Sequence, residues 1–171
     1  MLSTMESRWE LHDGVLVEKP ARTWDHSCVV TDLGCCLMDQ MDRSAFRVFF
    51  GVRARRPPAT IVVADVMVVP MHYGDEFRGR GDVLAIFDEP LPLVAEGWSS
   101  LEFGFDVDAK IPIYKERGDL EIWRIHPYER TVTSWVRQPD GSYRETTLRG
   151  GVVALAALPG LKIDLERLFA V

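Results

Sequence analysis

The 171-residue sequence lacks several features that would place it in a specialised class of protein. Its longest apolar runs are about ten residues, whereas a helix that spans a bilayer needs about 20. Its first residues contain neither the basic stretch nor the apolar stretch of a secretion signal. The formal net charge is -6, which excludes a globally basic nucleic-acid binder. We therefore expect a cytoplasmic protein that does not associate with membranes.

Cysteine is also scarce. The three cysteines, Cys28, Cys35 and Cys36, cannot all pair with one another, so we do not expect an extracellular fold held by disulfides. All three fall within one predicted helix, and we interpret them as core thiols of a reduced protein. The composition, 47% hydrophobic and 27% charged, excludes disorder and coiled coils. The length predicts a single domain over residues 1–171.

Turn residues and apolar periodicity divide the chain into helices and strands. Asp13-Gly14 predicts a β-hairpin near the N-terminus, and Gln138-Pro139-Asp140-Gly141-Ser142 predicts another near the C-terminus. Between the hairpins we predict helices over residues 24–41 and 106–117 and strands over residues 46–52, 60–69, 93–96 and 120–125; a short helix or turn over residues 161–169 ends the chain. This order predicts an α+β fold in which helices flank a central mixed β-sheet.

Two carboxylates stand out because each lies alone within an apolar run. Asp65 interrupts residues 60–69, which we expect to form one central strand buried on both faces, and Glu96 lies in the next apolar strand. A buried lone carboxylate costs several kcal/mol unless it is paired or bound to a metal. On neighbouring strands, both side chains can hold one hard cation such as Mg²⁺. Each can instead form a salt bridge with an arginine at a strand end.

Lys110 is a third candidate, because it lies at the start of a helix that must return toward the sheet after Glu96. A lysine beside a cation-activated water can orient that water and favour the hydroxide. The commoner position of a lysine is an exposed helix face. The residues themselves leave both interpretations open.

Several motifs, taken in order, resemble a known family. They are Trp9-Glu10-Leu11-His12-Asp13-Gly14, His26 at a helix start, Ala64-Asp65-Val66, Val94-Ala95-Glu96-Gly97-Trp98-Ser99, Asp106-x-x-x-Lys110-x-x-x-Tyr114 and Gly118-Asp119-Leu120-Glu121-Ile122-Trp123. This ordered set covers nearly the whole chain. It resembles the bacterial Uma family of restriction-endonuclease-like proteins, within the PD-(D/E)XK nuclease superfamily.

The resemblance implies a restriction-endonuclease-like core that hydrolyses DNA phosphodiester bonds with Mg²⁺ or Mn²⁺. Asp65 and Glu96 match the acids that hold the cation. Lys110 matches a lysine that assists the attacking water from the helix, because Trp98 stands where the superfamily usually has its lysine. Glu10 matches a further acidic ligand or orienting residue. The histidine at the start of the first helix, His26, matches one that either donates to phosphate or is structural.

Contact with nucleic acid requires local positive charge on this acidic protein. Arg53 and Arg55 belong to a cluster of five arginines over residues 43–56, and Arg78 and Arg80 lie in a Gly-rich excursion over residues 70–91. We predict that these four arginines contact phosphates, with the excursion acting as a clamp. Arg53 and Arg55 also fit the outward face of a strand.

Two further hypotheses compete with a DNA endonuclease. A catalytically silent nucleic-acid-binding or interaction module would keep the fold, and its Asp65 would pair with an arginine. A nuclease of RNA or single strands would use the same chemistry as a DNA endonuclease. In either enzyme Asp65 and Glu96 would share one cation, and Lys110 would point at it. Cleavage of both strands requires two sites, so we expect a homodimer.

Overall fold

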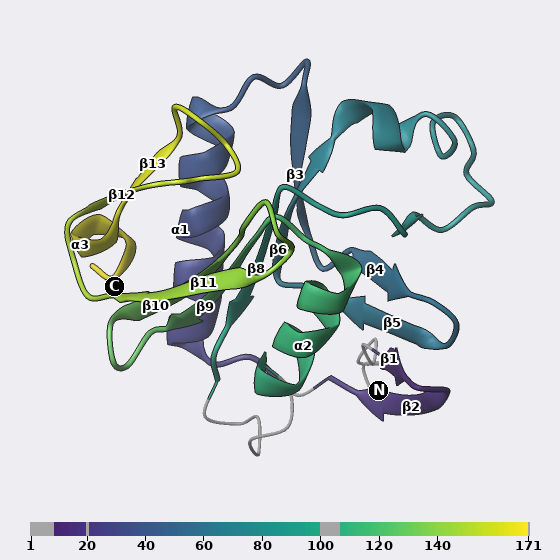
Figure 1. Cartoon of the computed structure of the whole chain (residues 1–171), viewed down its shortest axis with the longest axis horizontal. Helices are drawn as coiled ribbons and strands as arrows, with labels where there is room; N and C mark the ends of the chain where they lie inside the picture. Colours follow the sequence, from purple (N-terminus) through teal and green to yellow (C-terminus); the bar gives the residue numbers. More distant parts are fainter. Residues whose placement is uncertain (1–8, 20, 100–106, 171) are drawn as a thin grey trace, which may run out of the picture.

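The computed structural model describes residues 9–19, 21–99 and 107–170. Two β-sheets form the centre of the fold (Figure 1). The smaller contains β1 (Trp9–His12), β2 (Val15–Glu18), β4 (Arg53–Arg56), β5 (Thr60–Val63) and β7 (Ile86–Phe87). The larger contains β3 (Phe46–Phe50), β6 (Val66–Pro70), β8 (Leu93–Gly97), β9 (Glu121–His126), β10 (Thr131–Arg137) and β11 (Tyr143–Leu148).

The strand order is β2-β1-β5-β4-β7 in the five-stranded sheet and β11-β10-β9-β8-β6-β3 in the six-stranded sheet. Both sheets are mixed, because β4 pairs in parallel with β7 and β8 pairs in parallel with β9, while the other pairs are antiparallel. The remaining elements are α1 (Trp24–Gln40), η1 (Met71–Gly74), α2 (Val107–Arg117), β12 (Val152–Ala154), β13 (Lys162–Asp164) and α3 (Leu165–Leu168).

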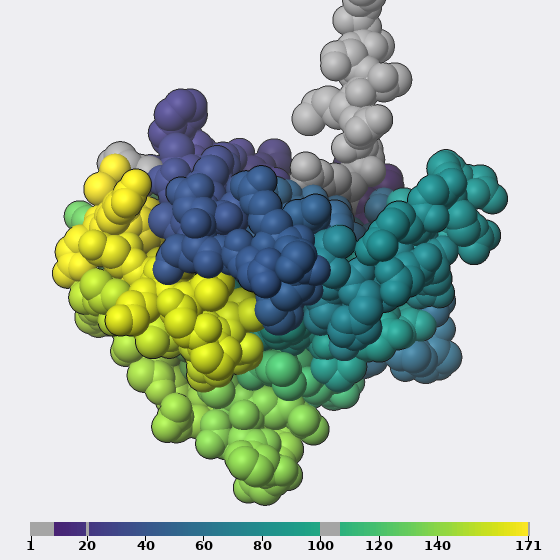
Figure 2. Space-filling model, turned by 90° about the horizontal axis from the view of Figure 1, so that it is seen from above, coloured from purple at the N-terminus to yellow at the C-terminus, as the bar shows by residue number. Residues whose placement is uncertain are grey.

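Two apolar cores lie on opposite faces of the six-stranded sheet. The first lies between this sheet, α1 and α3, and contains Leu33 and Trp123 (Figure 1). The second lies between the opposite face, α2 and the five-stranded sheet, and contains Met67 and Ile111. The space-filling view shows the C-terminal segment in yellow packed beside the region of α1 (Figure 2). This arrangement confirms the predicted α+β architecture with helices on a central sheet.

Both predicted hairpins are present. Asp13 and Gly14 have φ values of 48° and 85°, the left-handed conformation that a two-residue hairpin turn requires at both positions. At the other hairpin, Gly141 has a φ of 84° and β10 pairs with β11 from Val132–Leu148 to Arg137–Tyr143. The turn chemistry in the sequence therefore determines both connections.

The helix α1 begins at Trp24, directly after its cap residue Thr23. The hydroxyl of Thr23 accepts a hydrogen bond from the backbone N–H of His26 at 3.3 Å, which satisfies one otherwise unpaired donor of the first turn. Gly34 lies in the middle of the helix, where glycine is normally unfavourable. A Cβ there would approach the Phe50 ring to 2.0 Å, so the glycine allows β3 to pack closely against α1.

The prediction of one strand over residues 60–69 is wrong. The chain leaves β5 after Val63 and enters β6 at Val66, and these strands belong to different sheets. The strands that pair with them, β3 and β4, are separated at the same level. There Gly51 has a φ of 65° and its backbone N–H donates to the Ala64 carbonyl at 3.1 Å. β5 and β6 are both apolar because each is buried in its own sheet, so the sequence of residues 60–69 resembles that of a single strand. Asp65 marks the break, since its buried carboxylate requires polar partners that a ladder does not supply.

Three smaller expectations also need correction. The strand predicted over residues 46–52 ends at Phe50, residues 53–56 form a separate strand, β4, and the hairpin of β12 and β13 was not predicted. Cys35 is exposed, and Cys28 and Cys36 are only half-buried, so the cysteines are not core residues. They lie on α1 beside the positions that face the sheet. Among the described residues, no helix is long and apolar enough to cross a membrane.

Candidate functional site

The five predicted catalytic side chains meet at the break between β5 and β6. Each comes from a different part of the fold, namely β1, α1, the break itself, β8 and α2. All are buried, with exposed fractions of 0–2%. The residues are Glu10, His26, Asp65, Glu96 and Lys110. The fold therefore brings this predicted set together.

Asp65 is held by four donors, two on each carboxylate oxygen. Its Oδ1 accepts from Lys19 Nζ at 3.0 Å and from an Arg22 guanidinium nitrogen at 2.6 Å. Its Oδ2 accepts from His26 Nε2 and from the Gly97 backbone N–H, both at 2.9 Å. Burial raises the pKa of this carboxyl, but the charge of Lys19, with His26 and Arg22, outweighs burial and holds the pKa well below its ordinary value. The group is therefore a carboxylate at neutral pH.

Glu96 lies one strand away, on β8, and contacts two lysines. Its Oε1 accepts from Tyr114 at 2.5 Å and from Lys110 Nζ at 3.2 Å. Its Oε2 lies 3.7 Å from Lys19 Nζ. Burial, together with the charges of Glu96 and Glu10, raises the pKa of Tyr114 well above its ordinary value. The phenol therefore stays protonated and donates to Glu96.

Glu10 completes the acidic set from β1. Its Oε1 lies 2.7 Å from Lys110 Nζ and accepts from the Val63 backbone N–H, also at 2.7 Å. Its Oε2 lies 3.0 Å from His12 Nε2. Burial raises the pKa of Glu10, but the charges of Lys110 and Lys19 outweigh it, so the net pKa is lowered. Glu10 is accordingly a third buried carboxylate of the same cluster.

Carboxylates and ammonium groups alternate through the cluster. The order is Asp65, Lys19, Glu96, Lys110 and Glu10, with separations of 3.0, 3.7, 3.2 and 2.7 Å. Both lysines also donate to the Val63 carbonyl at the end of β5, Lys19 at 2.8 Å and Lys110 at 3.2 Å. With the guanidinium on Asp65, three basic side chains face three carboxylates. We call Asp65, Lys19, Glu96, Lys110 and Glu10 the acid–lysine cluster.

Sequence reasoning missed Lys19, Arg22 and the role of Tyr114. Lys19 and Arg22 lie in the aperiodic segment between β2 and α1, where no pattern distinguishes a buried cation from an exposed one. The charge balance was an available signal, because three buried acids require more than one buried cation nearby. Tyr114 lies one helical turn after Lys110 and therefore on the same face of α2.

His26 forms a hydrogen bond with Asp65 in this structure. Its Nε2 faces the carboxylate, which can only accept, so Nε2 carries the proton. Its buried Nδ1 has no hydrogen-bond partner in the described part of the chain. Gly97 permits this contact, because a Cβ at that position would lie 2.8 Å from the His26 ring. The histidine thus orients the Asp65 carboxylate.

The cluster also permits a test of whether the residues suit a divalent metal. Among the described residues, no three histidine, cysteine, aspartate or glutamate side chains converge in a way that would hold a metal ion. Two carboxylates do flank one positive charge, since the Lys19 ammonium lies between Asp65 and Glu96 and stands in for a cation. Carboxylate and carbonyl oxygens are the ligands that Mg²⁺ and Mn²⁺ favour. The donor set therefore fits a hard cation at the position of this ammonium.

The four arginines predicted to contact phosphates lie outside the cluster. Arg55 forms a two-nitrogen ion pair with Asp88, as expected for the outward face of β4. Arg78 bonds to Asp75 at 3.2 Å and to the Met71 carbonyl at 3.3 Å. Arg53 is half-buried on β4 and Arg80 is exposed. The proposed contacts with phosphate therefore stay a prediction.

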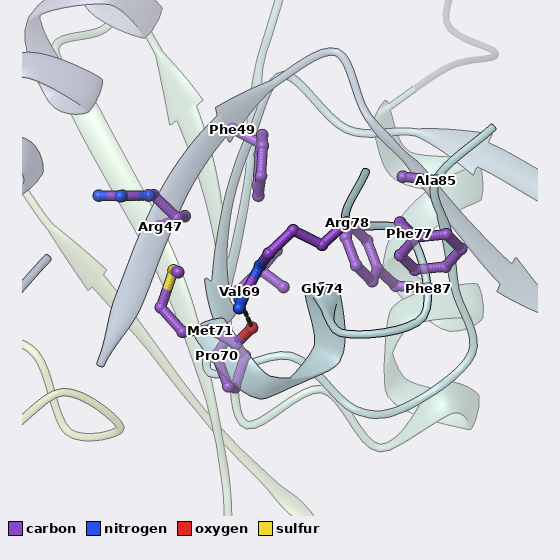
Figure 3. A pocket seen from close by; sticks show the side chains of 10 residues that line it. All are labelled: Arg47, Phe49, Val69, Pro70, Met71, Gly74, Phe77, Arg78, Ala85 and Phe87. Atoms are coloured by element: carbon purple, nitrogen blue, oxygen red, sulfur yellow. Dashed lines mark hydrogen bonds between the residues drawn. The ribbon is translucent and has the colours of Figure 1, made fainter. Parts of the chain in front are cut away.

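Arg78 does line a surface pocket of about 240 Å³ (Figure 3). The pocket lies between β3, the end of β6 and the excursion after it, and Arg47 lines it from β3. Its walls are largely apolar and include Phe49, Phe77 and Phe87. Figure 3 shows the Arg78 side chain crossing the pocket toward Met71, whereas the Arg47 guanidinium points away from the aromatic rings.

Comparisons with known proteins agree with this architecture. A crystal structure described as a "putative nuclease belonging to DUF820", from Anabaena variabilis ATCC 29413, superposes with a TM-score of 0.77 and 19% identity. The match covers 99% of this chain and 93% of that one, and at this identity it shows a shared fold. No curated protein matches the chain. A family model described as Uma2, "Putative restriction endonuclease", matches residues 1–166. The chain therefore belongs to the Uma2 family of restriction-endonuclease-like proteins.

Proposed function

We propose that the protein is a divalent-metal-dependent endonuclease that hydrolyses the phosphodiester bonds of DNA. The observation that carries the proposal is the pair of buried carboxylates, Asp65 and Glu96, that flank one cation while Lys110 contacts the far oxygen of Glu96. Membership of a restriction-endonuclease-like family supports the same reaction class. The substrate, the metal and the roles of individual residues are parts of the proposal.

Each residue has a defined task in this mechanism. Asp65 and Glu96 would hold Mg²⁺ or Mn²⁺, which supplies Lewis-acid activation of the phosphodiester and of the attacking water. The Lys110 ammonium, fixed between Glu10 and Glu96, contributes positive charge that stabilises the charge developing on the phosphate. His26 keeps Asp65 oriented.

The substrate would approach from the side of Arg22. The side chain of Arg22 is 24% exposed, whereas those of Lys19, Asp65, Glu96 and Lys110 are at most 2% exposed. A guanidinium at the mouth of a buried acidic site suits capture of a phosphate. The pocket with Arg47 and Arg78 would hold a more distant part of the nucleic acid. We place this activity in the cytoplasm and in a homodimer, whose two sites would cut two strands.

One observation favours the alternative of a catalytically silent binding module. Asp65 pairs with Arg22, the contact expected if the carboxylate is structural. Lys19 also neutralises Asp65, so the cluster satisfies its charges without a metal. In this alternative the acid–lysine cluster stabilises the fold, and nucleic acid or another protein would bind at the surface.

Calorimetric titration with Mn²⁺ separates the two hypotheses without a choice of substrate. We expect the wild type to bind one ion and Asp65→Ala to bind none. Asp119→Ala is the matched control, because Asp119 is an equally buried carboxylate whose partners are Arg117 and the Leu91 N–H, outside the cluster. The control should lose stability and keep the metal.

The second stage uses duplex DNA, single-stranded DNA and RNA with the same three proteins. Cleavage of duplex DNA by the wild type and Asp119→Ala, but not by Asp65→Ala, is the expected result. Cleavage confined to RNA or single strands would identify another substrate. Equal Mn²⁺ binding by all three proteins, or none even with a short oligonucleotide present, would contradict the proposed site.

A further inference from the structure

We infer that Lys19 is an internal cation of the site, and that its ammonium and a divalent metal ion occupy the Asp65–Glu96 pair in alternation. This inference rests on the proposed function, because it takes these two carboxylates as the metal ligands. It adds a residue outside the predicted catalytic set. It also gives the cluster two exclusive states, one that holds Lys19 and one that holds metal.

The surroundings of Lys19 Nζ are those of a bound cation. An ammonium has three N–H donors and no acceptor. Oxygen atoms of Val63, Asp65 and Glu96 lie 2.8, 3.0 and 3.7 Å from this nitrogen. The side chain of Lys19 is 2% exposed, so these oxygens replace water around the charge. Two carboxylates and a carbonyl also form a typical ligand set for Mg²⁺.

The two cations cannot share the position. A divalent ion binds carboxylate oxygens at about 2.0–2.1 Å, inside the distance at which Lys19 Nζ contacts the same Asp65 oxygen. Repulsion between two cations so close is large in a buried site. Metal binding therefore requires the ammonium to leave. Lysine suits this exchange because its charge lies at the end of a flexible four-carbon chain.

Lys110 does not have the same freedom. It lies within α2 and contacts Glu10 at 2.7 Å, a carboxylate that is not one of the two proposed ligands. It can therefore stay in place while metal replaces Lys19. Lys19, in contrast, lies after β2, in the segment that leads to α1 and carries the partly exposed Arg22. Departure of Lys19 would open the side of the cluster from which phosphate is proposed to approach.

Lys19→Met tests the exchange, since methionine keeps much of the length and loses the charge. We expect Mn²⁺ to bind this variant at least about tenfold more tightly than the wild type in calorimetry. In EDTA the variant should melt at a lower temperature than the wild type, because Asp65 and Glu96 lose a shared cation. Mn²⁺ should then raise its melting temperature by more than it raises that of the wild type.

Two further variants serve as controls. Lys19→Arg keeps the charge, so it should not bind Mn²⁺ more tightly than the wild type. Lys162→Met removes an equal charge from an exposed position on β13 and should leave the Mn²⁺ affinity unchanged within about twofold. If Lys19→Met does not fold in EDTA, refolding in Mn²⁺ provides the same comparison, and failure to fold in both media contradicts the inference.

The outcomes separate this inference from the proposed function. Equal Mn²⁺ affinity of the wild type and Lys19→Met would overturn the exchange and leave the metal site intact. Binding of one ion by the wild type and tighter binding by Lys19→Met would support both. Absence of binding in both proteins, with an oligonucleotide present, would overturn the exchange and the proposed metal-dependent activity together.

Discussion

Loss of the Asp65 charge should destabilise the fold more than loss of the Glu96 charge. The Asp65→Asn substitution removes the carboxylate that Lys19, Arg22 and His26 share. Breaking a buried pair by removing one partner costs about 3–5 kcal/mol. The lower end applies here, because Arg22 is partly exposed and Lys19 keeps the Val63 carbonyl. We expect a loss of about 3 kcal/mol, which lowers Tm by about 6–12 °C in a chain of this length.

Glu96→Gln should cost less, about 1–2 kcal/mol. Both lysines beside Glu96 keep a nearer carboxylate partner, at 2.7 Å for Lys110 and 3.0 Å for Lys19. The side-chain oxygen of glutamine can still accept from Tyr114. Urea denaturation of the wild type and both variants at pH 7 measures the difference.

The pH dependence of the stability difference between the wild type and Asp65→Asn tests whether the charge of Asp65 causes that difference. The pKa of Asp65 is lowered in the folded protein, so its contribution is fully present above the unfolded value of about 3.9 and disappears as pH falls through the folded pKa. The difference in unfolding free energy between the wild type and Asp65→Asn should therefore be constant from pH 7 to pH 5 and decrease below about pH 4. The reasoning is refuted if Glu96→Gln costs as much as Asp65→Asn, or if this difference increases on acidification.

Two further substitutions test the groups that hold the carboxylates. Tyr114→Phe removes the donor to Glu96 and should cost about 1.5–3 kcal/mol in urea denaturation. Because the folded pKa of Tyr114 is raised, the wild type should also lose stability above about pH 10, more steeply than the variant does, whereas equal slopes would contradict the assignment. Gly97→Ala should cost about 1–3 kcal/mol, since its Cβ would lie 2.8 Å from the His26 ring, and an unchanged midpoint would show that the ring moves freely.

The sequence predicts the local elements of this fold better than their assembly into sheets. Asp13-Gly14 specifies its hairpin because few residues adopt the required φ values, and the periodicity of α1 specifies its buried face. Residues 60–69 do not reveal that β5 and β6 belong to different sheets, because both halves are apolar for the same reason. The charge of Asp65 within this run was the available sign of a break.

The residues of the candidate site also differ in how well the sequence predicts them. Asp65 and Glu96 are recognisable because a charge within an apolar run is unusual. Lys110 is recognisable from its place at the start of the next helix, and the fold brings all three together. Lys19 and Arg22 lie in a segment without periodicity, and their burial depends on where β2 ends relative to α1. Local sequence patterns do not show where β2 ends relative to α1. Lys19 and Arg22 were therefore harder to predict than the acids of this site.

The balance of charge in the cluster bears directly on how its catalytic role must be tested. A fold that buries three carboxylates must neutralise them while it folds, before any metal is bound. Lys19, Lys110 and Arg22 meet this requirement, so a stable metal-free protein is expected whether or not the site is active. Stability measurements alone therefore cannot assign catalysis to Asp65. Competition between Lys19 and metal for one pair of oxygens tests the metal site that catalysis requires, because only a site that accepts metal shows it.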